Sequence, residues 1–490
     1  MFRFSRHHSA DTRPARRVAA VLWVFAILIL AAGGAVLLDG GNSLPARLAA
    51  AAVHRLRPPP AGHDLPGQWS VMEPADDGAG HALSRVQRAA ARKLLSLGYA
   101  AGSRPLPAHA GVTRHDPARS GHELMFFVSG HAPEALLIAR SGEILHRWRR
   151  DYRDAAATDP DAFLPPGRHN ATGCWRRAHL FPDGGILAIF EGHGLVKLDR
   201  DSRLLWAYPG HCHHDLHVAD DGRIWVLTRE AELAPRFRGD EPALLDYFTV
   251  LSPEGKFERR IPLLAALESS SYASLLDAAP AGGDVFHTNT LELLDGSLSH
   301  LSPIFERGNI LTSIRELNAL AILDPRRGTV VWALTGPWVK QHQPTLLPTG
   351  RLLLFDNLGR GGRSQVLEVD PLAREIAWSY ADGPGHRLFS ATCGSAQRLP
   401  GGNTLIVESD NGRALEVTPD GAVVWEYRNE HRAGEHGELI AAILDMVALP
   451  ADFPVGWLGR GRPRRGGGGG GGGPGGRRNS SARRSPPRDR

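Results

Sequence analysis

The feature that most constrains the fold is a repeat of short strands that occupies residues 120–430 of this 490-residue chain. One unit has a polar start, a Leu-Pro-Asp-Gly-like turn, an apolar strand, a Gly or Asn turn and an alternating strand that often ends in Trp-x-Tyr. Six units follow one another, at 122–150, 177–210, 211–263, 284–337, 342–383 and 393–429. Their spacing of roughly 35–55 residues is the period of a four-stranded β-propeller blade. Each unit must bury its apolar face against its neighbours, so the repeat predicts an all-β, six-bladed β-propeller.

A tryptophan recurs near the end of four of these units. Trp206, Trp332, Trp378 and Trp425 occupy the same place in their units. A large aromatic residue at one fixed place of a repeat is typical of packing between neighbouring blades. We therefore assign these four side chains to the core rather than to a binding site.

An uncharged segment of 21 residues, Val18–Leu38, precedes the repeat. It is long enough to cross a bilayer as a transmembrane helix. Arginines precede it and Asp39 follows it, so the positive-inside rule places residues 1–17 in the cytoplasm and the repeat outside. A cleaved signal peptide is the competing interpretation, because residues 31–35 read Ala-Ala-Gly-Gly-Ala. Both interpretations put the body in a bacterial periplasm, and the uncleaved helix predicts a single-pass protein of the inner membrane.

The segments around the repeat differ from it in composition. Residues 39–119 are rich in Pro, Gly, Ala and Arg and predict a linker, with one short amphipathic helix over Ala82–Leu97. Residues 431–458 predict a C-terminal helical segment, centred on Leu439–Val447, that packs on the propeller. Residues 459–490 hold eight consecutive glycines and many arginines, so this tail is predicted to be disordered.

The net charge of +5 does not indicate a nucleic-acid partner. Residues 460–490 contain ten arginines and one aspartate, and residues 1–17 contain five arginines and one aspartate. These two ends carry +9 and +4, which leaves −8 for the rest of the chain. A mildly acidic body gives no electrostatic attraction to a polyanion, so we expect no nucleic acid among the partners.

Histidines recur at the start of the first strand in three successive units. His213 and His287 lie nine residues before the turn glycine of their units, and His214 and His342 lie eight residues before it. In a propeller the first strand of each blade lines the central channel, so these imidazoles are predicted to gather at one channel mouth. Arg315 interrupts the apolar second strand of the fourth unit, where it is either held in an ion pair or directed at an anion.

Two further patterns have competing interpretations. His213, Asp215 and His217 alternate along one strand, so they share a face and form an alternative metal site. Cys174 and Cys212 lie at equal offsets in adjacent units and are candidates for a disulfide in an oxidising compartment, provided that their Cα atoms are close enough.

Three strings carry a family resemblance: HHDLHVADDG, FHTNTLELLDG followed by ILTSIRELNALAILD, and QHQPTLLPTGRLLLFDNLG. In order and spacing they resemble the bacterial arylsulfotransferases that use no nucleotide sulfate donor, over about residues 120–454. The resemblance implies a periplasmic six-bladed propeller that moves a sulfuryl group from an aryl sulfate to a phenolic acceptor. It implies a sulfohistidine intermediate, and we expect neither a cofactor nor a bound metal.

The resemblance also implies roles for individual residues. His342 of QHQP is similar to the nucleophile of the family, His287 of FHTN to a second site histidine, and Arg315 to the site arginine. Nucleophilic attack needs a neutral imidazole whose tautomer is fixed by a hydrogen bond at the other ring nitrogen. We expect Gln341 or Gln343 to make that hydrogen bond.

The HHDLH segment supplies the third site histidine under this resemblance. Its offset favours His213 or His214, and His217 remains open. The alternative function is a non-catalytic, membrane-anchored propeller that acts as a binding or assembly module of the cell envelope. The two hypotheses differ in whether the histidines and Arg315 converge.

Overall fold

The structure, a computed structural model, describes residues 102, 104–156, 173–238, 242–281, 283–383, 386–434 and 436–459. The predicted membrane segment 18–38, the predicted helix 82–97 and the tail beyond residue 459 lie outside these residues. Within the described ranges, no helix combines the length and the hydropathy that a membrane span requires.

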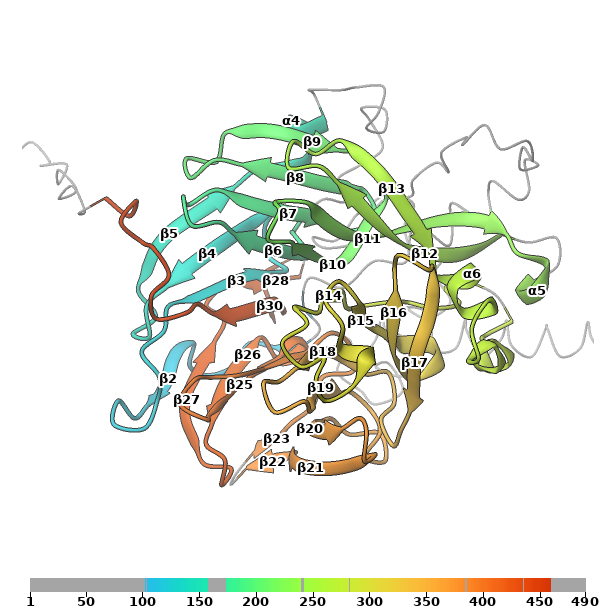
Figure 1. Cartoon of the computed structure of the whole chain (residues 1–490). Coiled ribbons are helices and arrows are strands. Elements are labelled where there is room, and N and C mark those ends of the chain that lie inside the picture. The colour runs from blue at the N-terminus through green and yellow to red at the C-terminus, as the bar shows by residue number, and fades with distance from the viewer. Residues whose placement is uncertain are drawn as a thin grey trace, which may run out of the picture. The chain divides into compact units, whose positions relative to one another are not determined.

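Six antiparallel sheets make up most of the described chain (Figure 1). Four of them consist of four consecutive strands each. The second sheet has β6 (Arg177–Leu180), β7 (Ile186–Phe190), β8 (Gly194–Leu198) and β9 (Leu204–Tyr208), and the third has β10 (Cys212–Val218), β11 (Ile224–Leu233), β12 (Pro242–Leu251) and β13 (Phe257–Pro262). The fourth has β14 (Glu292–Leu293), β15 (Ile310–Ile314), β16 (Ala319–Asp324) and β17 (Thr329–Thr335), and the fifth has β18 (His342–Leu346), β19 (Leu352–Asp356), β20 (Gln365–Asp370) and β21 (Glu375–Tyr380). Each of these sheets coincides with one unit of the sequence repeat.

The first and sixth sheets each contain a strand from a distant part of the chain. The first sheet has β3 (Met125–Ser129), β4 (Glu134–Ile138) and β5 (Ile144–Arg149), with β30 (Ile443–Ala448) beside β3. The sixth sheet has β24 (Ser395–Arg398), β25 (Thr404–Glu408), β26 (Arg413–Val417) and β27 (Val423–Arg428), with β2 (Gly111–His115) beside β27. Strand pairing therefore joins both ends of the described chain to sheets that are far away in sequence.

The prediction of a helix over Leu439–Val447 is wrong, because this segment forms β29 (Leu439–Ile440) and β30. A short apolar run does not by itself distinguish a buried strand from a buried helix. The free edge of β3 decides the outcome, since its backbone groups need partners and β30 provides them, with Phe126 opposite Val447. The predicted linker 39–119 also differs from the structure at its end, because β2 pairs with β27 as a fifth strand.

Consecutive sheets contact one another in a propeller-like arrangement (Figure 1). The contacts between sheets involve mainly the first two strands of each: β3 and β30 with β6, β10 with β6, β7 and β14, β15 with β18, and β18 and β19 with β24. The sixth sheet meets the first one, because β24 and β25 contact β30. The starts of the first strands are thereby brought close together.

Tryptophans of the outermost strands tie three of the sheets to a turn of the following sheet. Their indole N–H groups donate to carbonyl oxygens: Trp148 of β5 to Gly184 at 2.9 Å, Trp378 of β21 to Pro419 at 3.0 Å, and Trp425 of β27 to Arg140 at 2.9 Å. The packing role predicted for Trp378 and Trp425 is therefore confirmed.

The remaining described elements are short. β1 (Arg104–Pro105), β28 (Arg432–Ala433) and β29 form a small sheet, and β22 (Asp382–Gly383) pairs with β23 (His386–Arg387). The helices are α4 (Tyr152–Ala156), α5 (Pro235–Arg238) and α6 (Leu263–Glu268), with 3₁₀ turns η1 (Ala273–Ala278), η2 (Pro303–Phe305), η3 (Arg315–Leu317) and η4 (Ser409–Asn411).

All three cysteines are buried free thiols, so the disulfide considered for Cys174 and Cys212 does not form. Cys174 packs in an apolar cluster that also contains Cys393 and Trp175. Cys212 packs in a different cluster, with Leu187 among its members. Equal offsets in adjacent sheets therefore do not place these two side chains together.

Candidate active site

The candidate site lies where the first strands of the sheets begin, and the backbone is strained there. Four residues that have a Cβ take left-handed conformations at this level: His214 (φ 51°), His287 (φ 49°), Gln343 (φ 50°) and Cys393 (φ 53°). Each such conformation costs about 1–3 kcal/mol. The register of β10 with β11 and of β18 with β19 shifts in the same places. The strain therefore turns these side chains out of the regular alternation of a strand.

His342, the first residue of β18, is held in one tautomer. Its Nδ1 lies 2.8 Å from Asn357 Oδ1 and 3.0 Å from the carbonyl oxygen of Lys340. Asn357 presents its oxygen because its amide nitrogen donates to the carbonyl oxygens of Ser390 and Cys393, each at 2.8 Å. Both neighbours of Nδ1 are thus acceptors, so Nδ1 carries the hydrogen and Nε2 keeps its lone pair. Nε2 is buried and has no hydrogen-bond partner among the described residues.

Burial and charge keep the His342 imidazole neutral. Burial lowers the pKa of His342 well below 6.5, and the positive charge of Arg315 lowers it further. Arg176 and His287 act in the same direction. The neutral form is the one that has a nucleophilic nitrogen.

The expectation that Gln341 or Gln343 fixes this tautomer is wrong. The buried Gln341 amide donates to Ser313 Oγ at 3.0 Å and satisfies backbone oxygens of the fourth sheet. The Gln343 side-chain oxygen accepts from Arg177 at 3.1 Å. A buried amide bonds the nearest unsatisfied groups, and these lie away from the His342 ring.

The predicted histidines of the third and fourth sheets converge. The ring centroids of His214 and His287 are 4.7 Å apart, and His213 Nδ1 lies 2.9 Å from His214 Nδ1. Asp284 holds His287, with Oδ2 at 2.6 Å from Nδ1 and Oδ1 accepting the backbone N–H at 3.0 Å. Glu191 Oε2 accepts the backbone N–H of His214 at 2.8 Å. The carboxylates of Asp284 and Glu191 therefore orient this cluster of histidines.

Arg315 follows β15 and begins η3, so it stands at the end of the strand rather than within it. Its guanidinium pairs with one oxygen of Glu316, and Lys340 pairs with the other oxygen. Its charge nevertheless acts on the site, because it lowers the pKa of His342. The ion-pair interpretation of Arg315 is therefore confirmed, and its direction at an anion stays a prediction.

Two buried arginines that the sequence analysis did not single out add positive charge. Arg229 lies 4.0 Å from Asp284 Oδ2. Burial lowers the pKa of His214 most, and the positive charges of Arg176 and Arg229 lower it further. Arg229 stands five residues after the first residue of β11, as Arg315 does after that of β15. A comparison of the second strands would have found Arg229, whereas the sequence contains no such signal for Arg176.

The alternative metal set predicted on β10 does not come together. Asp215 Oδ1 pairs with Arg177 at 2.6 Å, and His217 Nδ1 faces the backbone N–H of Leu293 at 3.5 Å. Alternation fails because the register of β10 shifts between Cys212 and Leu216. His213 therefore joins the candidate site, and His217 lies against the fourth sheet instead.

Another set of metal-ligating side chains does meet at the site. Glu191, His213 and His214 each offer one ligand atom, and these atoms lie within 4.8 Å of one another. The guanidinium groups of Arg176 and Arg229 are buried nearby. Beside the larger effect of burial, Arg229 lowers the pKa of both His213 and His214, and Arg176 lowers the pKa of His214. Buried positive charge disfavours a cation at this position and favours an anion.

The site is enclosed, with one more accessible side. His342 is 2% exposed, whereas the side chains of His287 and Arg315 are each 18% exposed. Two cavities of about 560 and 460 Å³ lie elsewhere, against Glu123 and Asp295 respectively. The surroundings of His342 thus combine a neutral nitrogen with several cationic groups, an arrangement suited to an anion that reacts at its centre.

Comparison with known families identifies the class of protein. Residues 177–430, just over half of the chain, match the family described as arylsulfotransferase (ASST). The chain therefore belongs to the arylsulfotransferase family, as the resemblance of its motifs indicates. No curated protein is significantly similar to it.

Solved structures that are similar to the chain share little sequence with it. A protein of unknown function from Bacteroides caccae is 13% identical, with a TM-score of 0.43, over 66% of this chain and 98% of that one. A streptogramin B lyase is 12% identical, with a TM-score of 0.39, over 71% of this chain and 95% of that one. The WD40 β-propeller domain of Doa1 is 11% identical, with a TM-score of 0.34, over 66% of this chain and 98% of that one. Likenesses at this level carry no inference about function.

Proposed function

We propose that this chain is a six-bladed β-propeller enzyme that moves a sulfuryl group from an aryl sulfate to a phenolic acceptor, through a sulfohistidine at His342. The state of His342 carries the proposal. Asn357 and Lys340 fix the hydrogen on Nδ1, and Nε2 is buried with no partner among the described residues. Family membership supports the same class of reaction.

In the first step the Nε2 lone pair of His342 attacks sulfur. The bond between sulfur and the aryl oxygen breaks, and the phenolate leaves with the electron pair. In the second step a phenol oxygen attacks the same sulfur, the N–S bond breaks, and the electron pair returns to Nε2. The covalent intermediate divides one difficult displacement into two easier ones.

His287 is the proposed acid and base. Its Nδ1 is held by Asp284 at 2.6 Å, which orients the ring and stabilises its protonated form. A protonated His287 gives its Nε2 proton to the leaving phenolate, and the neutral ring takes the acceptor's proton in the second step. Asp284 acts through His287 and is therefore a positioning residue.

Positive charge stabilises the transferring group. Negative charge accumulates on the sulfuryl oxygens and on the leaving oxygen as the bond to sulfur breaks. We assign its stabilisation to Arg315, supported by the buried Arg176 and Arg229 and by a hydrogen bond from His214. Because these groups are positioned before substrate binds, they need little reorganisation during the reaction.

The substrate enters from the side of His287 and Arg315 in this proposal. These are the site side chains with appreciable exposure, at 18% each. The His342 ring lies deeper, so the sulfate end of the donor points inward and the aryl group outward. This orientation also leaves space on the outer side for the acceptor.

The competing function is a non-catalytic module of the envelope. That hypothesis expects the site side chains to point to separate surfaces. The 4.7 Å contact between His214 and His287, and the effect of Arg315 on the pKa of His342, favour a common site instead.

The proposed location is the inner membrane, with residues 18–38 as a single-pass anchor and the body in the periplasm. The uncharged 21-residue segment and the arginines before it support this location. Protease added to intact spheroplasts tests it: we expect the body to be digested and residues 1–17 to be protected.

Trapping the intermediate tests the reaction. The full chain is incubated with 4-nitrophenyl sulfate without acceptor, quenched, and analysed by peptide mass spectrometry. We expect a sulfuryl group on the peptide that contains His342, and its loss when phenol is added.

Two variants make the result decisive. His342→Ala should abolish both label and turnover, whereas His300→Ala, an exposed histidine outside the site, should change neither. Turnover that continues in His342→Ala, or a range of aryl sulfates that produces neither nitrophenolate nor label, contradicts the proposal.

A further inference from the structure

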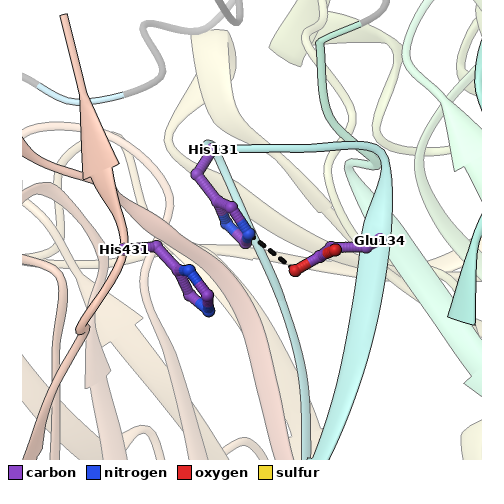
Figure 2. Close-up of side chains that lie close together, drawn as sticks. All are labelled: His131, Glu134 and His431. Atoms are coloured by element: carbon purple, nitrogen blue, oxygen red, sulfur yellow. Dashed lines mark hydrogen bonds and ion pairs between the residues drawn. The ribbon is translucent and has the colours of Figure 1, made fainter. Parts of the chain in front are cut away.

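A second group of titratable side chains lies where the first and sixth sheets meet. His131 stands in the turn between β3 and β4, Glu134 is the first residue of β4, and His431 lies between β27 and β28. Figure 2 shows the His131 and Glu134 side chains directed toward each other, with the His431 ring beside the His131 ring. One ligand atom from each, an imidazole nitrogen or a carboxylate oxygen, lies within 4.8 Å of the others.

We propose that His131, Glu134 and His431 form a divalent transition-metal site, best suited to Zn²⁺. Two imidazoles and one carboxylate are a common protein ligand set of zinc, which takes four ligands in a tetrahedral arrangement. Three protein ligands leave one position for water. This site is separate from the proposed sulfuryl-transfer site and does not depend on it.

The imidazole rings already lie in contact. The centroids of His131 and His431 are 3.6 Å apart and the rings are nearly parallel, at 2°. His131 Nε2 lies 2.7 Å from Glu134 Oε1. Parallel rings do not point their lone pairs at one ion, so binding requires each ring to turn about its Cβ–Cγ bond, a torsion with a broad minimum for histidine.

Outer partners hold the other ends of two of these ligands. Ser129 Oγ bonds His131 Nδ1, so the remaining nitrogen of this ring is the one directed at the group. Arg147 bonds both Glu134 oxygens, at 2.8 and 2.9 Å. Hydrogen bonds of this kind orient metal ligands, and a carboxylate oxygen has more than one lone pair to offer.

Charge distinguishes this group from the group formed by Glu191 in the candidate active site. Arg147 and Arg149, the cations beside Glu134, are 45% and 55% exposed, so solvent screens them. The arginines near Glu191 are buried and act at low dielectric. A cation is therefore better tolerated beside Glu134, whose side chain is 0% exposed and close to both histidines.

A metal at this place would connect two ends of the sheet array. His131 belongs to the first sheet, and His431 follows the last strand of the sixth sheet. A cross-link between residues so far apart in sequence closes a long loop and restricts the unfolded chain strongly. Metal that binds only the folded state also stabilises it by mass action.

Zinc titration of the chelator-treated full chain tests the proposal. Binding is measured by calorimetry, and stability is measured as the melting temperature. Co²⁺ in place of Zn²⁺ provides a visible absorption band whose intensity reports tetrahedral coordination. We expect binding at this site, a higher melting temperature with zinc, and an intense Co²⁺ band.

Single substitutions assign the site. His431→Ala should weaken zinc binding at least about 100-fold, in line with the loss of a ligand, and Glu134→Gln should weaken it as well. The His431 side chain stacks on His131, and the backbone hydrogen bonds of His431 with Asn429 and Ala441 do not depend on that side chain, so this variant should keep its fold. His436→Ala, an exposed histidine nearby, is the matched control and should bind as the parent does.

Three results overturn the proposal. They are no binding of zinc or cobalt to the parent chain, unchanged affinity in His431→Ala, and binding lost in His214→Ala but kept in His431→Ala. The last result would place the ion at the Glu191 group.

Discussion

Asn357 offers the sharpest test of how the proposed nucleophile is prepared. Its oxygen accepts the Nδ1 hydrogen of His342 at 2.8 Å, and its nitrogen donates to the carbonyl oxygens of Ser390 and Cys393. Asn357→Leu removes the acceptor and both donors at similar volume. Asn357→Asp keeps an acceptor and removes only the donors. The two variants therefore separate the role of the acceptor from that of the donors.

The magnitudes follow from these contacts. The imidazole becomes positively charged as Nε2 attacks, and a hydrogen bond to a charged group is worth about 1.5–3 kcal/mol. Its loss in Asn357→Leu should lower kcat about 10- to 150-fold, since each 1.36 kcal/mol is tenfold in rate. Ser390 O keeps the Ser364 hydroxyl as a donor at 3.1 Å, whereas Cys393 O loses its side-chain donor. Both variants should therefore lose about 1–3 kcal/mol of folding free energy.

The assay combines kinetics, pH dependence and stability. kcat and KM are measured with 4-nitrophenyl sulfate and phenol from about pH 5 to pH 9, and unfolding is followed in urea. The parent should show no loss of kcat through protonation of His342 near pH 6.5, because burial and Arg315 hold its pKa well below that value. Asn357→Asp places a carboxylate beside the ring, which raises the pKa of His342. Its kcat should then fall on the acid side.

Two outcomes refute the reasoning about the tautomer. If Asn357→Leu loses stability but keeps the kcat and pH profile of the parent, the hydrogen bond to Nδ1 does not prepare His342. Equal loss of kcat in both variants, in proportion to their loss of stability, would lead to the same conclusion.

Three further outcomes are expected. Arg315→Met should lower kcat/KM about 100- to 1,000-fold, as expected for loss of a charge-stabilising donor. It should also raise the pKa of His342, so that activity declines in acid. Arg315→Lys should recover part of the loss, and near-parental kinetics in Arg315→Met would exclude a charge-stabilising role for Arg315. Burial raises the pKa of Glu292 to about 8 from its ordinary 4.5, so the stability linked to its proton is complete below pH 4.5 and is lost as pH rises through about 8. Glu292→Gln should therefore melt at a higher temperature than the parent near pH 9 but not near pH 4, and an equal difference at both values would contradict this. Trp148→Ala should lower the free energy of unfolding by about 3–5 kcal/mol in urea, because the side chain is fully buried, whereas Leu205→Ala, 56% exposed, should change it by less than about 0.5 kcal/mol.

The repeat could be predicted from the sequence because its signals are local. Turn residues such as Gly222 and Gly402 have positive φ, and a buried apolar strand follows each of these turns. The tryptophans are predictable for the same reason, because they occupy the same place in each of their units. Local signals do not say which strand covers a free edge, and for that reason β30 was predicted as a helix.

The candidate site was predictable in part. The offsets of His214, His287 and His342 reflect a shared level in neighbouring sheets, and the structure brings His214 and His287 into contact. Asn357 was not predictable, because its role depends on the position of β18 beside β19 and on the carbonyl groups around its amide. The metal pattern on β10 failed because strand alternation holds only while the register is regular.

The pairing of β30 with β3 has a consequence for how the protein is made. Met125–Ser129 leaves the ribosome early, yet its hydrogen-bonding partner Ile443–Ala448 is among the last folded segments to be synthesised. At translation rates of about 5–20 residues per second, the early strand waits roughly 15–60 s for this partner. An unpaired apolar edge invites association with other chains during that interval. Nascent molecules should therefore need a chaperone until translation is complete.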